Sequence, residues 1–283
     1  MGHEKLLQDT MAEMTATAVA SAARREAAVL LPIGVIEAHG PHLPIGTDAY
    51  LALQLCRLTQ KYAATHGRET LIAPPYYWGI NSVLGDFAGS FRIRAETAAA
   101  LLTDVIDSLI ANAFNEVLIV SHHGDRAHND MILDVLQKAH LRGLTGVRWL
   151  YAPARWNMIG RLGQTGKEPI WVPWDHAASL DAFKVTGVFG VHADEYETAA
   201  MVRYYPETVD FDALRGLEPT KLTVDDLAAW RRGGADARRL TPDGYFGAPN
   251  PVDPDLWRTY DETARIMAGA IVRAAASDSS GPL

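Results

Sequence analysis

The sequence contains one cysteine, Cys56, among 283 residues, so a disulfide within the chain is excluded and a reducing compartment is expected. It has no apolar run long enough to span a bilayer, since the longest, near residues 27–36, is only half the required length. The first residues are polar and lack the apolar segment of a secretion signal. We therefore expect a cytoplasmic protein without a membrane partner.

Clusters of Lys and Arg are also missing, and the net charge is -8, so nothing indicates a nucleic-acid partner. Apolar runs alternate with segments of helical periodicity along most of the chain. Such alternation is typical of a mainly parallel sheet covered by helices on both faces. Strands are predicted near residues 28–34, 71–73, 116–121 and 147–151, and helices near 47–66, 95–114, 129–141, 193–204 and 254–275.

No internal repeat or linker divides the chain, which predicts a single domain over residues 1–283 with its core at about 29–275. The tail, residues 277–283, is expected to fray. The fold class is therefore α/β, with three layers in the order α/β/α. Residues 152–191 break the regular pattern, and such a long irregular segment is usually functional or disordered.

Imidazoles and carboxylates follow two of the predicted strands. Glu37 and His39 come after the first strand, and His123 and Asp125 come after the third. Because the carboxyl ends of parallel strands meet at one edge of a sheet, these groups are expected to converge. Asp48, at the start of the next helix, can turn back over the same edge.

A divalent cation such as Zn²⁺ accepts imidazole nitrogen and carboxylate oxygen together. Taken singly, Glu37 and Asp48 could be ordinary helix-end charges, and His39 could be a hydrogen-bonded loop residue. Taken as a set, they favour a metal site, in which a carboxylate such as Asp48 can bridge two ions.

Residues 31–48, which read L-P-I-G-V-I-E-A-H-G-P-H-L-P-I-G-T-D, closely resemble the opening signature of the creatininase family of metal-dependent amidohydrolases. Three later blocks resemble that family in the same order, and the likeness spans roughly residues 29 to 270. A weaker similarity lies in the loop at 244–249. The three blocks are F-A-G-S-F-R-I-R-A-E-T at 87–97, I-V-S-H-H-G-D at 119–125 and H-A-D-E-Y-E-T at 192–198.

The resemblance implies the ligands of one or two divalent ions, with Zn²⁺ expected and Mn²⁺ an alternative in one site. Glu37, Asp48 and His123 match the ligands of the first ion. His39 and Asp48 match ligands of the second ion, and Asp125 stands where the family places its third ligand. Asp125 is shorter than the glutamate of creatininase itself.

The resemblance also implies a reaction. His192 matches the acid/base histidine of the family, and Glu197 matches the acidic residue near it. The expected activity is hydrolysis of a C–N bond in an amide or cyclic amide, with water activated by the metal and His192 donating a proton to the leaving nitrogen.

Two blocks depart from the family pattern. Ser121 and His122 replace the usual Asn-Gly, so His122 could be a metal ligand, a substrate contact or a partner of a ligand. Asn81 and Ser82 stand where many relatives carry Ser and His. The predicted substrate contacts are His122, Ser82, Trp171, Trp174 and Glu195.

Other readings stay open at this point. The family fold also hosts deformylases, peptidase-like enzymes and ring-opening C–C hydrolases of cyclic ketones. An inactive relative with a structural metal would need neither His192 nor Glu197, and a scaffold protein would leave the clustered carboxylates unexplained. The expected partner is a small-molecule substrate. Because members of this family commonly form hexamers built from dimers, the resemblance implies a homo-oligomer.

Overall fold

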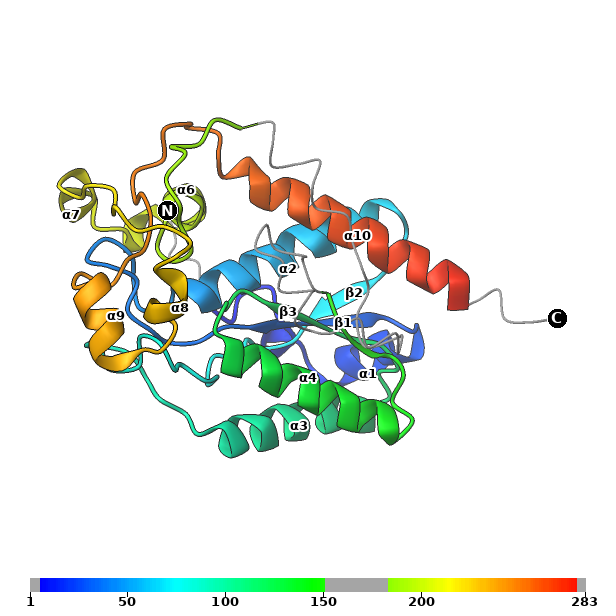
Figure 1. Ribbon diagram of the computed structural model, residues 1–283. Helices are drawn as coiled ribbons and strands as arrows, with labels where there is room; N and C mark the ends of the chain where they lie inside the picture. The colour runs from blue at the N-terminus through cyan, green and yellow to red at the C-terminus, as the bar shows by residue number, and fades with distance from the viewer. Residues whose placement is uncertain (1–5, 151–182, 279–283) are drawn as a thin grey trace.

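The sheet at the centre of the molecule has four strands in the order β2–β1–β3–β4 (Figure 1). The computed structural model describes residues 6–150 and 183–278. Every strand pairing is parallel, and β1 and β3 align from Val29 with Val117 to Ile33 with Ser121. The predicted parallel sheet is confirmed. Its strands are β1 (Ala28–Ile33), β2 (Thr70–Ile72), β3 (Val117–Ser121) and β4 (Val147–Trp149).

Apolar side chains of β1 are buried on both faces of the sheet. Ala28 and Leu30 pack into one apolar cluster, whereas Val29, Leu31 and Ile33 pack into another. This alternation follows from the two-residue period of a strand. Helices α2 (Thr47–Thr65) and α10 (Arg258–Asp278) cover the first face, and α3 (Ala95–Ala111) and α4 (Arg126–Leu141) cover the second. The predicted three-layer α/β fold is therefore confirmed.

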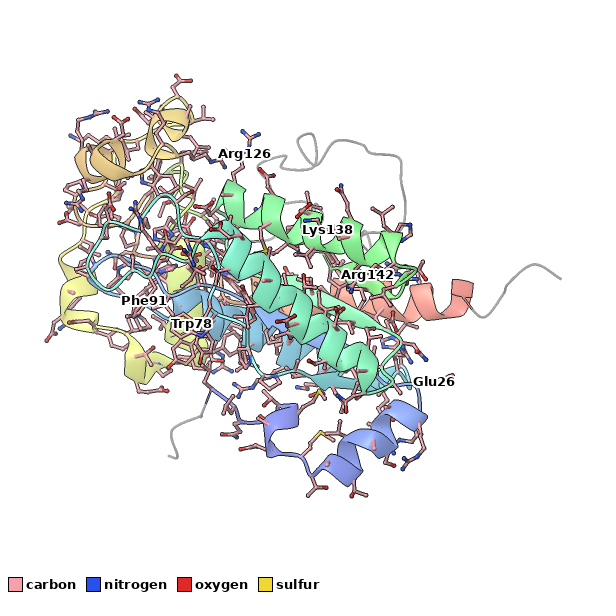
Figure 2. All side chains as sticks on the ribbon, turned by 90° about the horizontal axis from the view of Figure 1, so that it is seen from below. Glu26, Trp78, Phe91, Arg126, Lys138 and Arg142 are labelled. Carbon is pink, nitrogen blue, oxygen red and sulfur yellow. The ribbon has the colours of Figure 1, made fainter. Side chains whose placement is uncertain are left out.

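Figure 2 looks onto the face covered by α3 and α4, with Arg126 and Arg142 at opposite ends of α4. The guanidinium of Arg142 donates two hydrogen bonds, of 2.8 and 2.7 Å, to the carboxylate of Asp107 on α3. This ion pair ties the two helices together below the sheet. Helix α1 (Ala16–Arg24), which sequence periodicity did not predict, lies near the same face.

Helix α2 begins at Thr47, where a helix was expected, and the hydroxyl of Thr47 donates to the carbonyl of Pro44 at 2.7 Å. Helix α4 begins at Arg126, three residues before the predicted start, because the side chain of Asp125 accepts hydrogen bonds from the N–H groups of Ala127 and His128.

Short helices gather beyond one end of the sheet (Figure 1). Trp230 and Phe246 centre a third apolar cluster there, together with Val83 and Leu84. Within residues 6–150 and 183–278, no helix has the length and apolar character needed to cross a bilayer. The remaining elements are η1 (Met11–Glu13), α6 (Glu195–Tyr204), η2 (Pro206–Thr208), α7 (Phe211–Arg215), α8 (Leu227–Trp230) and α9 (Gly234–Leu240).

Candidate metal centre

The approach of α2 to the end of β1 depends on Gly34. A Cβ at this position would lie 2.6 Å from the backbone of both Asp48 and Ala49. A larger residue would therefore push the first turn of α2 away from the chain that leaves β1. The close approach brings Asp48 beside Glu37, and both side chains are buried.

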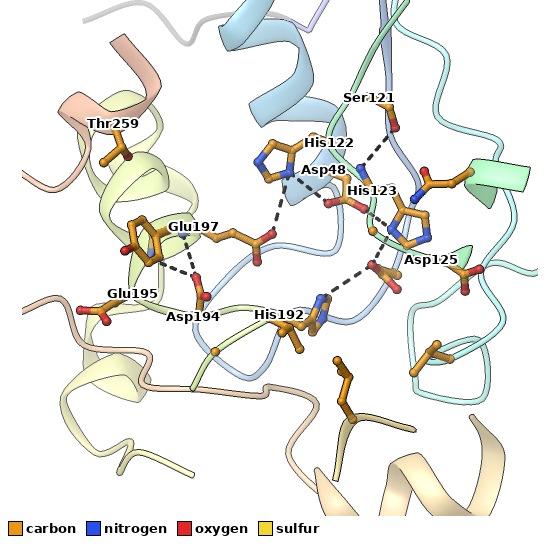
Figure 3. A pocket seen from close by; sticks show the side chains of 18 of the residues that line it. Asp48, Ser121, His122, His123, Asp125, His192, Asp194, Glu195, Glu197 and Thr259 are labelled. Carbon is orange, nitrogen blue, oxygen red and sulfur yellow. Dashed lines mark hydrogen bonds and ion pairs between the residues drawn. The ribbon is translucent and has the colours of Figure 1, made fainter. Parts of the chain in front are cut away.

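The first group of candidate ligands joins Glu37, Asp48 and His123. Nδ1 of His123 lies 3.1 Å from Oε1 of Glu37 and 2.9 Å from Oδ2 of Asp48. Its Nε2 lies 3.1 Å from the carbonyl of Ile80, which fixes the ring with Nδ1 turned toward the two carboxylates. The sequence placed these three residues in one site, and the structure brings them together. Figure 3 shows His123 beside Asp48.

A second group shares Asp48 with the first and consists of His39, Asp48 and Glu197. Nε2 of His39 lies 3.5 Å from Oδ1 of Asp48 and 3.9 Å from Oε2 of Glu197. The two oxygens of Asp48 therefore face different groups, as a carboxylate between two metal ions would. In Figure 3, Glu197 extends from α6 toward His122 and Asp48.

The orientation of His39 shows that these residues fit a cation. Its Nδ1 lies 3.0 Å from the carbonyl of Glu37, and a hydrogen bond donated there leaves the lone pair on Nε2. Nε2 is buried without a hydrogen-bond partner and faces the carboxylates of Asp48 and Glu197. A lone pair that faces carboxylates is unfavourable unless a positive charge lies between them. A divalent metal satisfies this arrangement.

The charges of the site also favour a cation. Burial alone would lower the pKa of His39, but the carboxylates of Asp48, Glu197 and Glu37 outweigh it and raise this pKa to about 9. Burial raises the pKa of Glu37 above its usual range. For Asp48, the neighbouring imidazoles, first of all His123, overcome the effect of burial and hold its pKa well below its usual range. Closely packed carboxylates here stabilise positive charge on whatever group supplies it.

His192 lies against the same carboxylates. Its Nε2 is 2.8 Å from the carbonyl of Ala38, its Nδ1 is 3.9 Å from Oε1 of Glu37, and its ring centre is 4.2 Å from that of His39. Burial, followed by the charge of His39, lowers the pKa of His192 to about 4. A hydrogen bond donated by Nε2 to Ala38 leaves the lone pair of the ring on Nδ1, on the side of Glu37. Glu197, which the resemblance placed near this histidine, faces His39 and His122 and accepts a hydrogen bond of 2.6 Å from the N–H of Ala193.

Asp125 lies outside both ligand groups, in contrast to the expectation from sequence. One of its oxygens caps α4, and the other accepts hydrogen bonds from the N–H and hydroxyl groups of Ser82, the former at 2.8 Å. The carboxylate is thus directed toward Ser82 and the helix end. Glu197 provides the carboxylate of the second group instead.

The other predicted substrate contacts are distributed differently. Both oxygens of Glu195 accept hydrogen bonds from the N–H of Thr186, at 3.1 and 3.0 Å, and one also accepts from its hydroxyl at 2.7 Å. Glu195 therefore anchors the chain at Thr186 beside the cavity. Ser82 lines the cavity but is bonded to Asp125. Trp171 and Trp174 lie outside the described residues.

One residue of the site was not predicted because no sequence pattern indicated it. Tyr260 comes from α10, and its hydroxyl lies 2.6 Å from Nε2 of His122. No motif surrounds it, and only the packing of α10 against α2 brings it to the sheet edge. His122 itself, predicted as a ligand, a substrate contact or a partner of a ligand, has Nδ1 3.4 Å from Oδ1 of Asp48.

The site opens into a cavity of about 690 Å³. Its polar wall includes Glu37, Asp48, His123, His192 and Glu197, whereas Leu55, Val120, Trp149 and Leu150 provide an apolar wall. Such a mixture of a broad apolar lining and a few convergent polar groups is typical of a small-molecule or peptide site.

Together, the fold and these groups define an α/β protein with a buried centre able to hold metal. The family model for creatininase (creatinine amidohydrolase) matches residues 12–267. The chain therefore belongs to the creatininase family and is a creatininase-family hydrolase.

Relatives named for different activities resemble this chain. The mycofactocin precursor peptide peptidase of Mycobacterium ulcerans is 30% identical over 230 residues, which cover 78% of this chain and 74% of the relative. The creatinine amidohydrolase of Pseudomonas putida is 21% identical, over 74% of this chain and 76% of that protein. The family thus spans peptide and small-ring substrates.

Solved structures of creatininase share the fold. One creatininase aligns with a TM-score of 0.60 at 16% identity, covering 97% of this chain and 99% of the other. A mutant creatininase of Zn-Zn type aligns at 0.62 and 17% identity, covering 97% and 98%. A manganese creatininase gives 0.60 at 16% identity, covering 95% and 98%.

Proposed function

We propose that this chain is a divalent-metal-dependent hydrolase that cleaves a C–N bond of an amide. One observation carries the proposal. Two buried groups of ligands share Asp48, and backbone carbonyls orient the imidazoles of His39 and His123 so that each presents a nitrogen to carboxylates. Zinc is the cation that best suits this mixture of imidazole and carboxylate, with manganese as the alternative.

In this proposal, Glu37, Asp48 and His123 hold one ion, and His39, Asp48 and Glu197 hold the other. Bound cations would lower the pKa of water at the site and polarise a substrate carbonyl. Asp48 fixes the spacing of the two positions because each of its oxygens faces one of them.

His192 moves the proton. Its Nδ1, which carries the lone pair, takes up the proton released by the attacking water and returns it to the leaving nitrogen, which completes cleavage of the amide. The hydrogen bond between Nε2 and the carbonyl of Ala38 keeps Nδ1 turned toward the centre through both steps. Ser82 and Glu195 act indirectly, by holding Asp125 and the chain at Thr186.

The volume of the cavity favours a substrate larger than a single small ring. Its volume of about 690 Å³ lies within the range of about 300–1,000 Å³ that is typical of sites for drug-sized ligands. The apolar wall at Leu55 and Trp149 can contact a hydrophobic side chain while the amide lies at the polar wall. We therefore favour a substrate with the dimensions of a short peptide over a simple cyclic amide.

The test is hydrolysis by the full chain of a panel that contains short peptides, N-formylated compounds, cyclic amides and a cyclic ketone. Product formation is followed by mass spectrometry, with the protein as purified, after treatment with a chelator, and after addition of Zn²⁺ or Mn²⁺. Amide cleavage that disappears with the chelator and returns with metal is expected. Full activity in the metal-free protein would contradict the proposal.

The panel also separates the alternative reactions. Release of formate alone would identify a deformylase, and ring opening of the ketone alone would identify a C–C hydrolase.

A further inference from the structure

We propose that His122 is a fourth protein ligand of the second cation, binding through Nδ1, and that Tyr260 positions its ring. The inference rests on the proposed function, because it assumes that the group of His39, Asp48 and Glu197 holds an ion. It adds a ligand that the departure at residues 121–122 gives to this chain. His122 is part-buried and lines the cavity beside Asp48 and Glu197.

His122 approaches the same two carboxylates as His39. Nδ1 of His122 lies 3.4 Å from Oδ1 of Asp48 and 3.8 Å from Oε1 of Glu197. Nε2 of His39 lies 3.5 Å from Oδ1 of Asp48 and 3.9 Å from Oε2 of Glu197. Ligands that bind zinc at about 2.1 Å in a tetrahedron are about 3.4 Å apart. The two imidazoles therefore stand at similar distances from the two carboxylates, and each distance is within about half an ångström of this value.

The alternative is that His122 only donates a hydrogen bond to these carboxylates. Charge-assisted N–H···O bonds are typically about 2.7–2.9 Å long. The separations at His122 are 3.4 Å to Asp48 and 3.8 Å to Glu197. The first is at the long limit of a hydrogen bond and the second is beyond it, whereas a cation between the three groups would satisfy both carboxylates.

Tyr260 gives His122 the same support that backbone carbonyls give the other imidazoles. The phenol oxygen lies 2.6 Å from Nε2 of His122, and the two rings stack with centres 5.6 Å apart. When Nε2–H donates to this oxygen, the lone pair is on Nδ1 and faces Asp48 and Glu197. A ring held in this way is ready to bind metal without rearrangement.

The two cation positions would then differ in whether a coordination position is left for water or substrate. Four protein ligands fill a tetrahedral ion, as in structural zinc sites, whereas three leave a position for water or substrate. The second ion would therefore fix Asp48 and Glu197 in place. The first ion, held by Glu37, Asp48 and His123, would be the one that substrate reaches.

The experiment is a titration of the metal-free full chain with Co²⁺, followed by visible absorption and by elemental analysis of bound cobalt. The wild-type protein is expected to bind two ions. In His122→Ala, affinity for one ion should fall by about 100-fold or more, with the other ion bound as before. Tyr260→Phe should weaken the same ion by about 10–100-fold, the usual effect of losing a partner of a ligand.

Matched controls separate this result from unfolding. His66→Ala removes an exposed histidine at the end of α2 and should leave both affinities unchanged. Circular dichroism reports the fold of each variant, and His122→Leu replaces His122→Ala if the latter does not fold. Wild-type binding of both ions by His122→Ala, or a single ion in the wild type, would overturn the inference while leaving metal-dependent hydrolysis intact. A wild-type chain that binds no Co²⁺ would overturn the proposed function itself.

Discussion

Carboxylates lie at both ends of the parallel strands, but their basic partners differ between the amino ends (the amino edge) and the carboxyl ends (the carboxyl edge). At the amino edge, the side chains of Glu69 and Glu116 lie beside arginines: Nε of Arg25 donates to Glu69 at 2.9 Å, and Arg68 pairs with Glu116. At the carboxyl edge, the ion pairs of Glu37, Asp48 and Glu197 within the described ranges are with histidines.

This difference separates a structural edge from a functional one. A guanidinium is always charged, so an Arg–Glu pair is complete by itself. An imidazole can carry a proton or offer a lone pair, so its positive charge can be exchanged for a metal ion. Histidines at the carboxyl edge therefore leave the charge of Glu37 and Asp48 available to a cation, whereas arginines at the amino edge do not.

The largest effect is expected for Asp48→Asn, which removes the shared charge and keeps the side-chain volume. Both ions should be lost, and amide hydrolysis should fall by at least about 10³-fold, since a bound metal contributes several kcal/mol to the transition state. Elemental analysis of the purified variant and its rate on the identified substrate check both points. Retention of two ions would show that the carboxyl edge does not depend on this carboxylate.

His192→Ala should lower the rate of hydrolysis by about 10²–10⁴-fold, the usual contribution of a proton-transferring group. The metal content should stay as in the wild type. Glu37 and His39 could hold an ion together with His192, but each also belongs to a group that contains Asp48. Rate and metal content are measured on the same sample. Loss of an ion would instead make His192 a ligand, which its position 3.9 Å from Glu37 would permit.

Two substitutions at Asp125 test whether this residue is a metal ligand or only the cap of α4. Asp125→Asn keeps the cap of α4 but turns an amide nitrogen, which cannot accept a hydrogen bond, toward the N–H of Ser82, so stability should fall while the metal content stays unchanged. Asp125→Ala should cost at least about 1 kcal/mol in the free energy of unfolding through loss of the cap and of the bonds to Ser82, again with both ions retained. Thermal unfolding and elemental analysis provide the readouts. Loss of one ion in both variants would return Asp125 to the ligand set.

The smallest effect is expected for Asp107→Asn on α3, which breaks the exposed ion pair with Arg142. Exposed pairs contribute less than about 1 kcal/mol, so the unfolding free energy should change little and the metal content should not change. Denaturant titration measures the first quantity. A large loss of metal in this variant would show that metal binding also depends on ion pairs away from the carboxyl edge, which would contradict the comparison.

Much of the site could be predicted from sequence because its residues follow two strongly patterned strands. The apolar runs of β1 and β3 locate Glu37, His39 and His123 at the sheet edge, and the parallel order of the strands makes these residues converge. The resemblance to the creatininase family then indicated the same first group that the structure brings together.

Other parts depended on information that sequence patterns do not contain. An aspartate before a helix can be a cap or a ligand, and the apolar periodicity of α4 begins too late to show that Asp125 caps it. The role of Tyr260 depends on the packing of α10 over α2, which joins residues far apart in the chain. Glu197 was associated with His192 by its motif, yet the first turn of α6 directs it to His39.

The most direct test of the central claim is the metal content of the wild-type chain. The purified protein is made metal-free with a chelator, equilibrated with Zn²⁺, dialysed and analysed for zinc per chain. The buried groups around Asp48 predict two ions that resist dialysis and are removed again by the chelator. A chain that retains no zinc after dialysis would contradict the account.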